Sequence, residues 1–466
     1  MAETAKKRPA MGTDFTSGAV MPLLLRFFLP FLLANLLNSL YNTIDMMIIG
    51  QFVGSSGIVA VSLGGKMLNL FTNIGLALAG GGQILISQLL GAKRRGELNS
   101  TIGTLFSEMM ALSVLFAVAT LLLSRNIITW LNTQDEAFDG ALAYLRITCI
   151  GLPLLFGYNA VSSVLRGMGD SIRPLIFIAI AAAFNLVGDV VFIVCFGLGV
   201  AGTALATVLD QGLSLVFSIV FLYRRRTRFG FDFRLRSFAI DWRKLWIMCR
   251  LGFPAALRSF CITGTQLVMM GYVNLFGLAA AAAYSIGDKI YHLANIFATS
   301  VMQAGGSMIA QNFGAGKPER VQRIVRCSFA LTLAAAVVLS VPSLLFPEAF
   351  FGLFDHSADV LVYAQAFMAI SSLIYFLSAA VSSYEVVMQG TGNAMLSMIG
   401  GILDGVVLRV GLSFVFAYGL GLGVIGFFLA DALSRLAPLV LGGVYYHSGA
   451  WKRRKTLVSQ SDGETE

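Results

Sequence analysis

The chain has 466 residues, of which 57% are hydrophobic and 12% charged, and its formal charge at pH 7 is +9. Its mean hydropathy of +0.79 is too high for a water-exposed surface to cover, which excludes an ordinary soluble fold. The positive charge lies in tails and short loops between apolar segments, where membrane topology explains it, so we expect no nucleic-acid partner. The partner that this composition predicts is the lipid bilayer.

Apolar segments long enough to cross a bilayer, which takes roughly 20 residues, recur along the whole chain. Backbone groups in lipid must bond internally, and runs this long lack the alternation of barrel strands, so each segment is predicted to be a helix. The predicted spans are 21–48, 57–90, 101–123, 139–165, 174–195, 200–223, 247–273, 278–312, 325–347, 360–387, 395–418 and 421–446.

The amino-terminal tail carries Lys6, Lys7 and Arg8, and the apolar run after it is too long for a signal peptide. If this tail is cytoplasmic, the cytoplasmic segments collect most of the Lys and Arg residues, and the outer loops hold only Arg125 among basic residues. The asymmetry predicts that both termini are cytoplasmic, which requires an even number of spans.

Internal similarity divides the chain into two halves. Residues 197–209 and 421–433 share eight of thirteen positions at an offset of 224. Six spans were therefore duplicated, and because six is even, the copies are expected to be related by a pseudo-two-fold axis along the membrane normal. The expected segments are a tail at 1–20, an N-lobe at 21–223, a cytoplasmic linker at 224–246, a C-lobe at 247–446 and a second tail at 447–466.

The first span carries a polar face. Asn35, Asn38, Asn42 and Asp45 follow a spacing that places all four on one side of a helix. An ionisable side chain at the bilayer centre costs at least roughly 2.5 kcal/mol, so Asp45 is expected to face a cavity or a partner. For Asn35 and Asn38 we favour interhelical hydrogen bonding. Pro30 removes a backbone hydrogen bond and predicts either a static bend or a hinge.

Two later spans of the first half add polar stripes, which are Asn185 with Asp189 and Thr203 with Thr207 and Asp210. Together with Asp45, these stripes can enclose a site rich in oxygen atoms. Such a site suits Na⁺, and a buried carboxylate suits H⁺, so the residue types leave both coupling ions open.

The second half does not repeat this acidic cluster. At the offset of the repeat, Asp45, Asn185 and Asp189 correspond to Met269, Arg409 and Ser413. One cation-coupling site, in the N-lobe, is the consequence.

The second half has polar residues of its own. Asp288 and His292 share a face of the eighth span and are candidates for binding a cationic substrate or a proton. Asp288 is equally suited to neutralise Arg258 or Lys289. Asp404 with Arg409, and Asp431 with Arg435, are expected to be structural ion pairs.

These residues resemble a known family, the multidrug and toxic compound extrusion (MATE) transporters, over essentially the whole chain after the first tail. The resemblance rests on the LP…LYNTID pattern from Leu29 to Asp45, the Q-x-x-G-A loops at Gln88 and Gln311, VLRGMGDSIRP at 164–174 with VMQGTGN at 387–393, and the N-x-x-x-D of Asn185 and Asp189.

The resemblance implies an all-α integral membrane protein of twelve helices in two six-helix lobes, which is a transporter and not an enzyme. It implies multidrug efflux by antiport of organic cations or other small amphipathic compounds against H⁺ or Na⁺, without a cofactor. We expect a monomer in the plasma (inner) membrane of a prokaryote. The alternative is a flippase of lipid-linked saccharides or lipids from the same superfamily.

The chain is most similar to the DNA-damage-inducible branch of prokaryotic transporters. That similarity assigns cation coupling, including a Na⁺ site, to Asp45, Asn185, Asp189 and Thr207, and bending to Pro30. Candidates for the lining of the substrate cavity are Asn38, Asn42, Arg258, Asp288 and His292. The acidic residues of the branch with a C-lobe cation site are missing, since the matching positions hold Cys261 or Ile262 and approximately Ser378.

Overall fold

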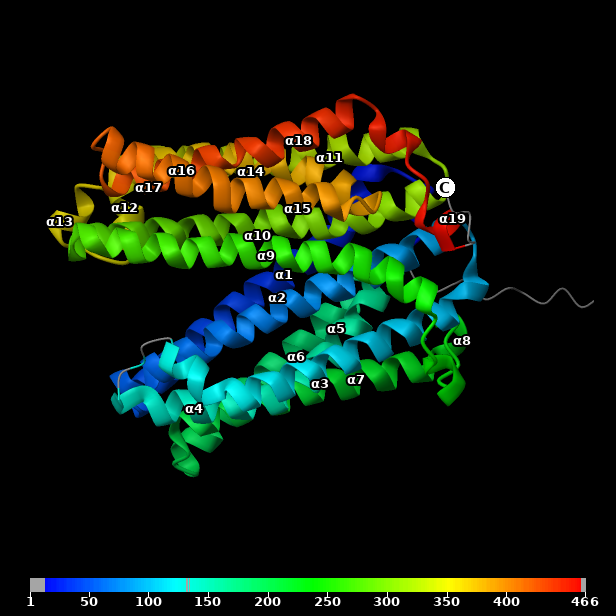
Figure 1. Ribbon diagram of the computed structural model, residues 1–466, viewed down its shortest axis with the longest axis horizontal. Coiled ribbons are helices and arrows are strands. Elements are labelled where there is room, and N and C mark those ends of the chain that lie inside the picture. Colours follow the sequence, from blue (N-terminus) through cyan, green and yellow to red (C-terminus); the bar gives the residue numbers. More distant parts are fainter. Residues whose placement is uncertain (1–12, 131–132, 134, 462–466) are drawn as a thin grey trace, which may run out of the picture. The chain divides into compact units, whose positions relative to one another are not determined.

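The computed structural model describes residues 13–130, 133 and 135–461, and every regular element in them is a helix (Figure 1). The long helices of the first half are α1 (Val20–Phe52), α2 (Ser55–Gly91), α3 (Leu98–Trp130), α4 (Asp135–Ile150), α5 (Leu152–Gly167), α6 (Ile172–Asp189) and α7 (Gly199–Arg224). Those of the second half are α9 (Trp242–Val273), α10 (Leu278–Gly314), α11 (Pro318–Leu345), α14 (Ala364–Gly390), α15 (Ala394–Ile402), α16 (Arg409–Phe414), α17 (Val424–Ser434) and α18 (Leu436–His447).

Shorter elements connect or interrupt these helices. Three are π-helical, namely η2 (Val190–Cys195), η5 (Leu403–Leu408) and η6 (Val415–Gly419). The others are η1 (Arg95–Glu97), α8 (Arg226–Phe229), η3 (Leu235–Phe238), η4 (Asn274–Phe276), α12 (Pro347–Gly352), α13 (Ala358–Leu361), η7 (Ala450–Arg453) and α19 (Leu457–Ser461).

Within the described residues, ten helical stretches are long and apolar enough to cross a membrane. The fourth predicted span is not one straight helix, because α4 and α5 meet at a 48° bend. Gly151 lies at that break and Pro153 directly follows it, and both residue types weaken a helix. The predicted span 278–312 corresponds to α10, which is not among these ten stretches. This helix has 37 residues and carries the charged pair Asp288 and Lys289.

The predicted duplication is visible in the backbone. Gly197 and Gly199 have positive φ angles of 67° and 52°, and their counterparts in the repeat, Gly421 and Gly423, have 69° and 57°. Glycine adopts positive φ at little cost, so these turns require it. Each glycine pair follows a π-helical segment, η2 in the first half and η6 in the second. The two halves thus repeat the same irregular backbone.

The chain forms two compact units, which we call the N unit and the C unit. Of the described residues, the N unit contains 13–17 and 37–248, and the C unit contains 18–36 and 249–461. Two helices therefore contribute residues to both units. They are α1 and α9, the first long helix of each half.

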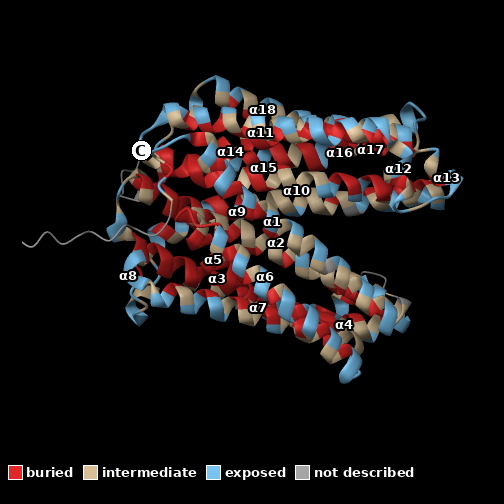
Figure 2. Cartoon of the chain, turned by 180° about the vertical axis from the view of Figure 1, so that it is seen from behind, coloured by how far each residue is buried: buried red, intermediate tan, exposed pale blue. Residues whose placement is uncertain are grey.

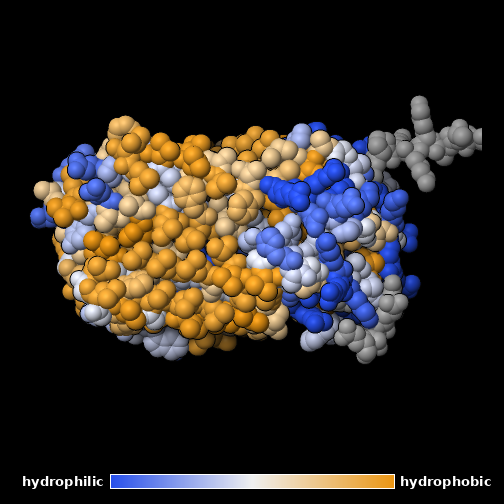
Figure 3. All heavy atoms as spheres, turned by 90° about the horizontal axis from the view of Figure 1, so that it is seen from above, coloured by the Kyte–Doolittle hydropathy of each residue, from blue (hydrophilic) through white to orange (hydrophobic). Residues whose placement is uncertain are grey.

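Each unit buries its own helix interfaces (Figure 2). In the N unit, α2 packs against α4 and α5, and α6 packs against α7. In the C unit, α14 is central and contacts α10, α11, α17 and α18. Large apolar side chains on the outer faces remain exposed, for example Leu122 at 80% and Val338 at 68%. Such surfaces suit lipid, and Figure 3 shows hydrophobic residues over the helices and hydrophilic ones gathered toward one end.

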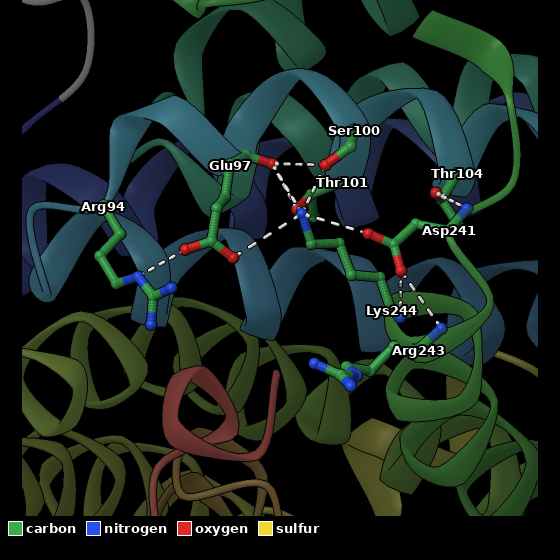
Figure 4. A network of polar contacts seen from close by, with 8 residues as sticks. All are labelled: Arg94, Glu97, Ser100, Thr101, Thr104, Asp241, Arg243 and Lys244. Atoms are coloured by element: carbon green, nitrogen blue, oxygen red, sulfur yellow. Dashed lines mark hydrogen bonds and ion pairs between the residues drawn. The ribbon is translucent and has the colours of Figure 1, made fainter. Parts of the chain in front are cut away.

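The segment between α7 and α9 is fastened to α3 of the N unit by a polar network (Figure 4). Lys244 is only 6% exposed, and its Nζ lies 3.7 Å from the Glu97 carboxylate and 3.6 Å from that of Asp241. The same Nζ donates a hydrogen bond to the Ser100 hydroxyl. A buried ammonium requires such partners, so Lys244 fixes the start of α9 to the N unit.

The segment between α7 and α9 also contacts α3 through close backbone packing. The Gly103 Cα lies so near the Ser237 carbonyl that a Cβ would be 1.6 Å from the oxygen, which only glycine permits. The Ser237 hydroxyl also donates to Asp232, and this hydrogen bond is the main cause that lowers the pKa of that exposed carboxyl. Phe229 and Phe231 are each 1% exposed. The segment predicted as a linker is therefore a packed part of the N unit.

Candidate functional site

Three buried aspartates come together in the N unit, and the first of them is Asp45. It lies on α1, two turns before the helix ends at Phe52, and it is 7% exposed. Tyr41 lies one turn earlier on the same helix, within electrostatic range of Asp45 and of the other two aspartates. The polar face predicted for the first span thus includes a phenol beside the carboxylate.

The second aspartate, Asp189, comes from α6. It has no exposed surface, and Asn185, one turn earlier, is 1% exposed. Among the described residues, neither the Asp189 oxygens nor the Asn185 amide atoms have a hydrogen-bond partner. The π-helical segment η2 begins at the next residue, Val190. Such segments are frequent at functional sites, because they reorient side chains and free backbone groups.

The third aspartate, Asp210, comes from α7 and is 8% exposed. Thr207 lies nearly one turn before it and donates a hydrogen bond from its hydroxyl to the Thr203 carbonyl, at 3.0 Å. The Thr207 side chain also lies close to the phenol of Tyr144 on α4. Four helices, α1, α4, α6 and α7, therefore contribute side chains to one cluster. We call Tyr41, Asp45, Tyr144, Asn185, Asp189, Thr207 and Asp210 the N cluster.

The carboxyl groups of the N cluster face one another. Asp45 and Asp189 are close enough to hydrogen bond when one of them carries a proton. Asp210 lies within electrostatic range of both. When all three are ionised, like charges repel in a low-dielectric environment, and a cation or a proton relieves that repulsion.

No basic side chain neutralises these carboxylates within the described part of the chain. None of the three takes part in an ion pair there. The charges that act on them come from one another and not from Lys, Arg or His. Buried carboxylates without a permanent partner are costly, which makes them candidates for binding a mobile cation.

The other predicted residues of α1 are divided between the units. Pro30 is buried inside α1 in the part that belongs to the C unit. Asn35, in the same part, donates a 2.9 Å hydrogen bond to the Ser300 hydroxyl of α10, which confirms its interhelical role. Asn38 is half-buried in the N unit. The side chain of Asn42 lies outside the described residues.

The predicted cavity residues of the C unit are not brought into one group. Arg258 on α9 forms an ion pair of 3.3 Å with Glu385 on α14, and Glu385 also accepts a 2.8 Å hydrogen bond from Ser397. Asp288 and His292 are exposed on α10. Arg258 is thus neutralised by Glu385 rather than by Asp288.

The expected ion pairs of the second half are present. Arg409 is 3.2 Å from Asp404, and Arg435 is 3.4 Å from Asp431. The two pairs are also joined, because Arg409 lies 2.7 Å from Asp431. We call these four residues the C network.

The structure adds three members to the site assigned from the sequence. Tyr41 had a local signal, since it lies one helical turn before Asp45 in the LYNTID motif. Asp210 belonged to a recognised polar stripe but not to the assigned set. Tyr144 had no signal, because one tyrosine in a predicted span is ordinary. Within the described residues, no three His, Cys, Asp or Glu side chains are arranged to hold a metal ion.

Two types of comparison relate this chain to known proteins. The profile of the MatE family matches it twice, over residues 30–191 and 254–415. The probable multidrug resistance protein YpnP of Bacillus subtilis is 27% identical over 451 residues, which are 96% of this chain and 99% of that protein. The probable multidrug resistance protein NorM of Thermotoga maritima is 24% identical over 446 residues, or 94% of each chain.

The fold is also similar to solved structures. One, described as an outward-facing conformation of a multidrug resistance MATE family transporter of the MOP superfamily, has a TM-score of 0.88. The sequence identity is 20%, and the match covers 96% of this chain and 100% of that chain.

Fold and comparisons define a multi-pass, all-helical membrane protein built from two copies of one unit, with the twelve-helix, two-lobe fold of MATE transporters. The chain belongs to the MatE family, whose profile covers more than half of it. The two matched regions begin at positions 30 and 254, which confirms the offset predicted from the sequence.

Proposed function

We propose that this protein is a secondary active transporter, without enzymatic activity or a cofactor. It exports organic cations or other small amphipathic molecules by antiport against H⁺ or Na⁺. The observation that carries the proposal is the N cluster, in which three buried aspartates face one another without a basic partner in the described residues. Its relatives named as multidrug resistance proteins support the class of cargo.

The N cluster offers a place for either coupling ion. A proton shared between Asp45 and Asp189 converts their repulsion into a hydrogen bond. A sodium ion would use the oxygens of Asp45, Asn185, Asp189 and Thr207, since carboxylate, amide and hydroxyl oxygens suit a hard cation. The unpartnered atoms of Asn185 and Asp189 support both versions.

Coupling to transport is proposed to run through α1. This helix carries Asp45 in the N unit and Pro30 in the C unit. Proline removes one backbone hydrogen bond, so bending costs less there than elsewhere in the helix. Binding of the cation at Asp45 would change the preferred bend at Pro30, and the difference in cation affinity between the two conformations would drive export.

The proposed cargo follows from charge. The carboxylates of the N cluster and the exposed Asp288 on α10 attract a cation, with His292, Asn38, Asn42 and Arg258 as further candidates to line the path. A flippase for lipid-linked saccharides would instead need a strongly cationic cavity for the pyrophosphate. An organic cation is therefore the cargo that we propose.

The proposed topology places the protein in the prokaryotic plasma membrane as a monomer, with both termini cytoplasmic. The tails are 1–20 and 447–466, and the cytoplasmic linker is 224–246. Single cysteines introduced at exposed Arg228 and exposed Asp359, in a variant whose five native cysteines are replaced by serine, provide the test. A membrane-impermeant thiol reagent added to whole cells should label only the cysteine at Asp359, and labelling of the other one would overturn the topology.

The decisive experiment measures ethidium transport by the purified protein in liposomes, with a pH gradient and a Na⁺ gradient imposed separately. One gradient should drive transport, and Asp45→Asn should abolish the driven component while Asp359→Asn, in the short helix α13 and exposed, retains it. Transport that neither gradient accelerates, or a fully active Asp45→Asn, would contradict the proposal. Movement of a lipid-linked saccharide but not of ethidium would favour the flippase.

A further inference from the structure

The C network occupies positions that the duplication relates to the N cluster. At the offset of the repeat, Arg409 is the counterpart of Asn185, and Asp431 is the counterpart of Thr207. The same offset relates the two matches of the family profile. Two of the four C-network residues thus stand at positions of the N cluster, whereas Asp404 and Arg435 correspond to Ile180 and Gln211.

The C network is buried and compact. Arg409 is 2% exposed, and its two terminal nitrogens reach different acids, one 3.2 Å from Asp404 and the other 2.7 Å from Asp431. Arg435 closes the network, 3.4 Å from Asp431 and 4.7 Å from the centre of the Tyr291 ring. The network thereby joins η5, α16, α17 and α10.

Charge is what distinguishes the two sets of residues. The N cluster has three carboxylates and no basic partner among the described residues, whereas the C network balances two carboxylates with two guanidinium groups. The repeat position that carries the neutral Asn185 in the first half carries the positively charged Arg409 in the second half.

We propose that the C network is a cation site filled from within the chain. The Arg409 guanidinium takes the place that a soluble cation takes in the N cluster, so this inference rests on the proposed function. A cation tethered to α16 cannot leave, and the C unit is permanently in the occupied state. Only the N cluster then changes its occupancy during transport, which gives one cation-binding step per chain.

The geometry of Arg409 fits a tethered cation better than a bidentate arginine–carboxylate pair. In a bidentate pair, two guanidinium nitrogens bind one carboxylate. In contrast, Arg409 binds Asp404 with one terminal nitrogen and Asp431 with the other. Its Nε has no hydrogen-bond partner among the described residues, and neither does the hydroxyl of Ser413, the counterpart of Asp189. The site therefore needs positive charge more than it needs the shape of arginine. Removing Arg409 leaves a site that would accept a small monovalent cation, of which guanidinium is the closest in chemistry.

The test is chemical rescue of the full-length protein in detergent, followed by its melting temperature. Arg409→Ala should lower the melting temperature by several degrees. Millimolar guanidinium chloride should restore most of the loss, and Na⁺ a smaller part, whereas the wild type should not gain from either salt. A matched control is the double variant Arg409→Ala/Asp404→Asn, which has the same space without the excess negative charge and should gain nothing from added cations.

Arg409→Lys is a second variant that tests the proposal, and it can be used if Arg409→Ala cannot be purified. Because a lysine also carries a tethered cation, this variant should fold and melt close to the wild type. Damage from Arg409→Lys equal to that from Arg409→Ala, or an Arg409→Ala protein that no cation restores, would overturn the inference and leave only a structural ion network. Because the readout is stability and not transport, this outcome is distinguishable from failure of the N-cluster mechanism, which the gradient experiment tests.

Discussion

The N cluster and the C network show two ways of placing charge inside a membrane protein. Both lie on duplicated helices, and both include buried aspartates. In the N cluster, Asp45 and Asp189 face each other without a basic partner among the described residues. In the C network, Asp404 and Asp431 are both bound by Arg409.

One repeated backbone thus holds carboxylates without a basic partner in the described part of one half and a paired network in the other, depending on the side chains at the repeated positions. Carboxylates without a partner destabilise the fold, and that cost is acceptable only where a mobile cation uses the site. A paired network has no such freedom. We therefore expect substitutions in the N cluster to change transport and substitutions in the C network to change stability.

The largest effect is expected from Asp431→Asn in the C network. The change leaves Arg435 without its acid and weakens the neutralisation of Arg409. Breaking a buried pair on one side typically costs about 3–5 kcal/mol. Denaturation of the purified protein should show this loss, and a variant as stable as the wild type would mean that the C network does not stabilise the fold.

Asp189→Asn in the N cluster should have the opposite effect, with stability kept and transport lost. It removes like-charge repulsion, so the melting temperature should stay the same or rise, while gradient-driven transport should fall by roughly 100-fold, the upper range of coupling between sites. Vesicle assays of the Asp189→Asn and Asp431→Asn proteins side by side provide the measurement. A strongly destabilised Asp189→Asn protein would argue that Asp189 is structural.

The N unit and the C unit are each packed at one end by a segment of their own. In the N unit, Gly103 contacts the Ser237 carbonyl, and in the C unit the tail buries Trp451 and Leu457. Gly103→Ala forces the segment before α9 to move and should cost about 1–3 kcal/mol, as overpacking does. Gly96→Ala, where a Cβ would meet nothing within 4 Å, is the matched control for the same thermal denaturation. Equal stability of the two variants would refute this packing.

The smallest effect is expected at Asn35, in the part of α1 that belongs to the C unit. Asn35→Ala removes the hydrogen bond to Ser300 and should cost about 0.6 kcal/mol, the average for such bonds between membrane helices. Transport should be retained, in contrast to Asp45→Asn on the same helix. A double-mutant cycle with Ser300→Ala isolates the coupling energy, and a cycle without coupling would mean that the bond contributes nothing.

Much of the fold could be predicted from the sequence. Long apolar runs predict helices because lipid forces the backbone to bond internally, and the constant offset between similar segments predicts the duplication that the family profile and the paired glycines confirm. The bend between α4 and α5 was missed, since the residues around Gly151 remain apolar and give no signal of a break in hydropathy.

The candidate site was predicted in part. Asp45 and Asp189 lie close together in the N unit, Asn185 lies one helical turn from Asp189, and Thr207 lies near Tyr144. The role of these residues in cation coupling stays a prediction. Tyr144 was not found, because helices that are distant in sequence meet only through packing.

By itself, the sequence determined that the chain is helical, membrane-spanning and duplicated, because hydropathy and repeats are properties of the chain order. Only the tertiary structure decided which charges are paired. Arg409 on α16 meets Asp431 on α17 although the two lie on different helices, while Asp45 meets Asp189 and, among the described residues, no lysine or arginine. Electrostatic energy falls off with distance in space and not along the chain, so partners are known only once the helices are packed.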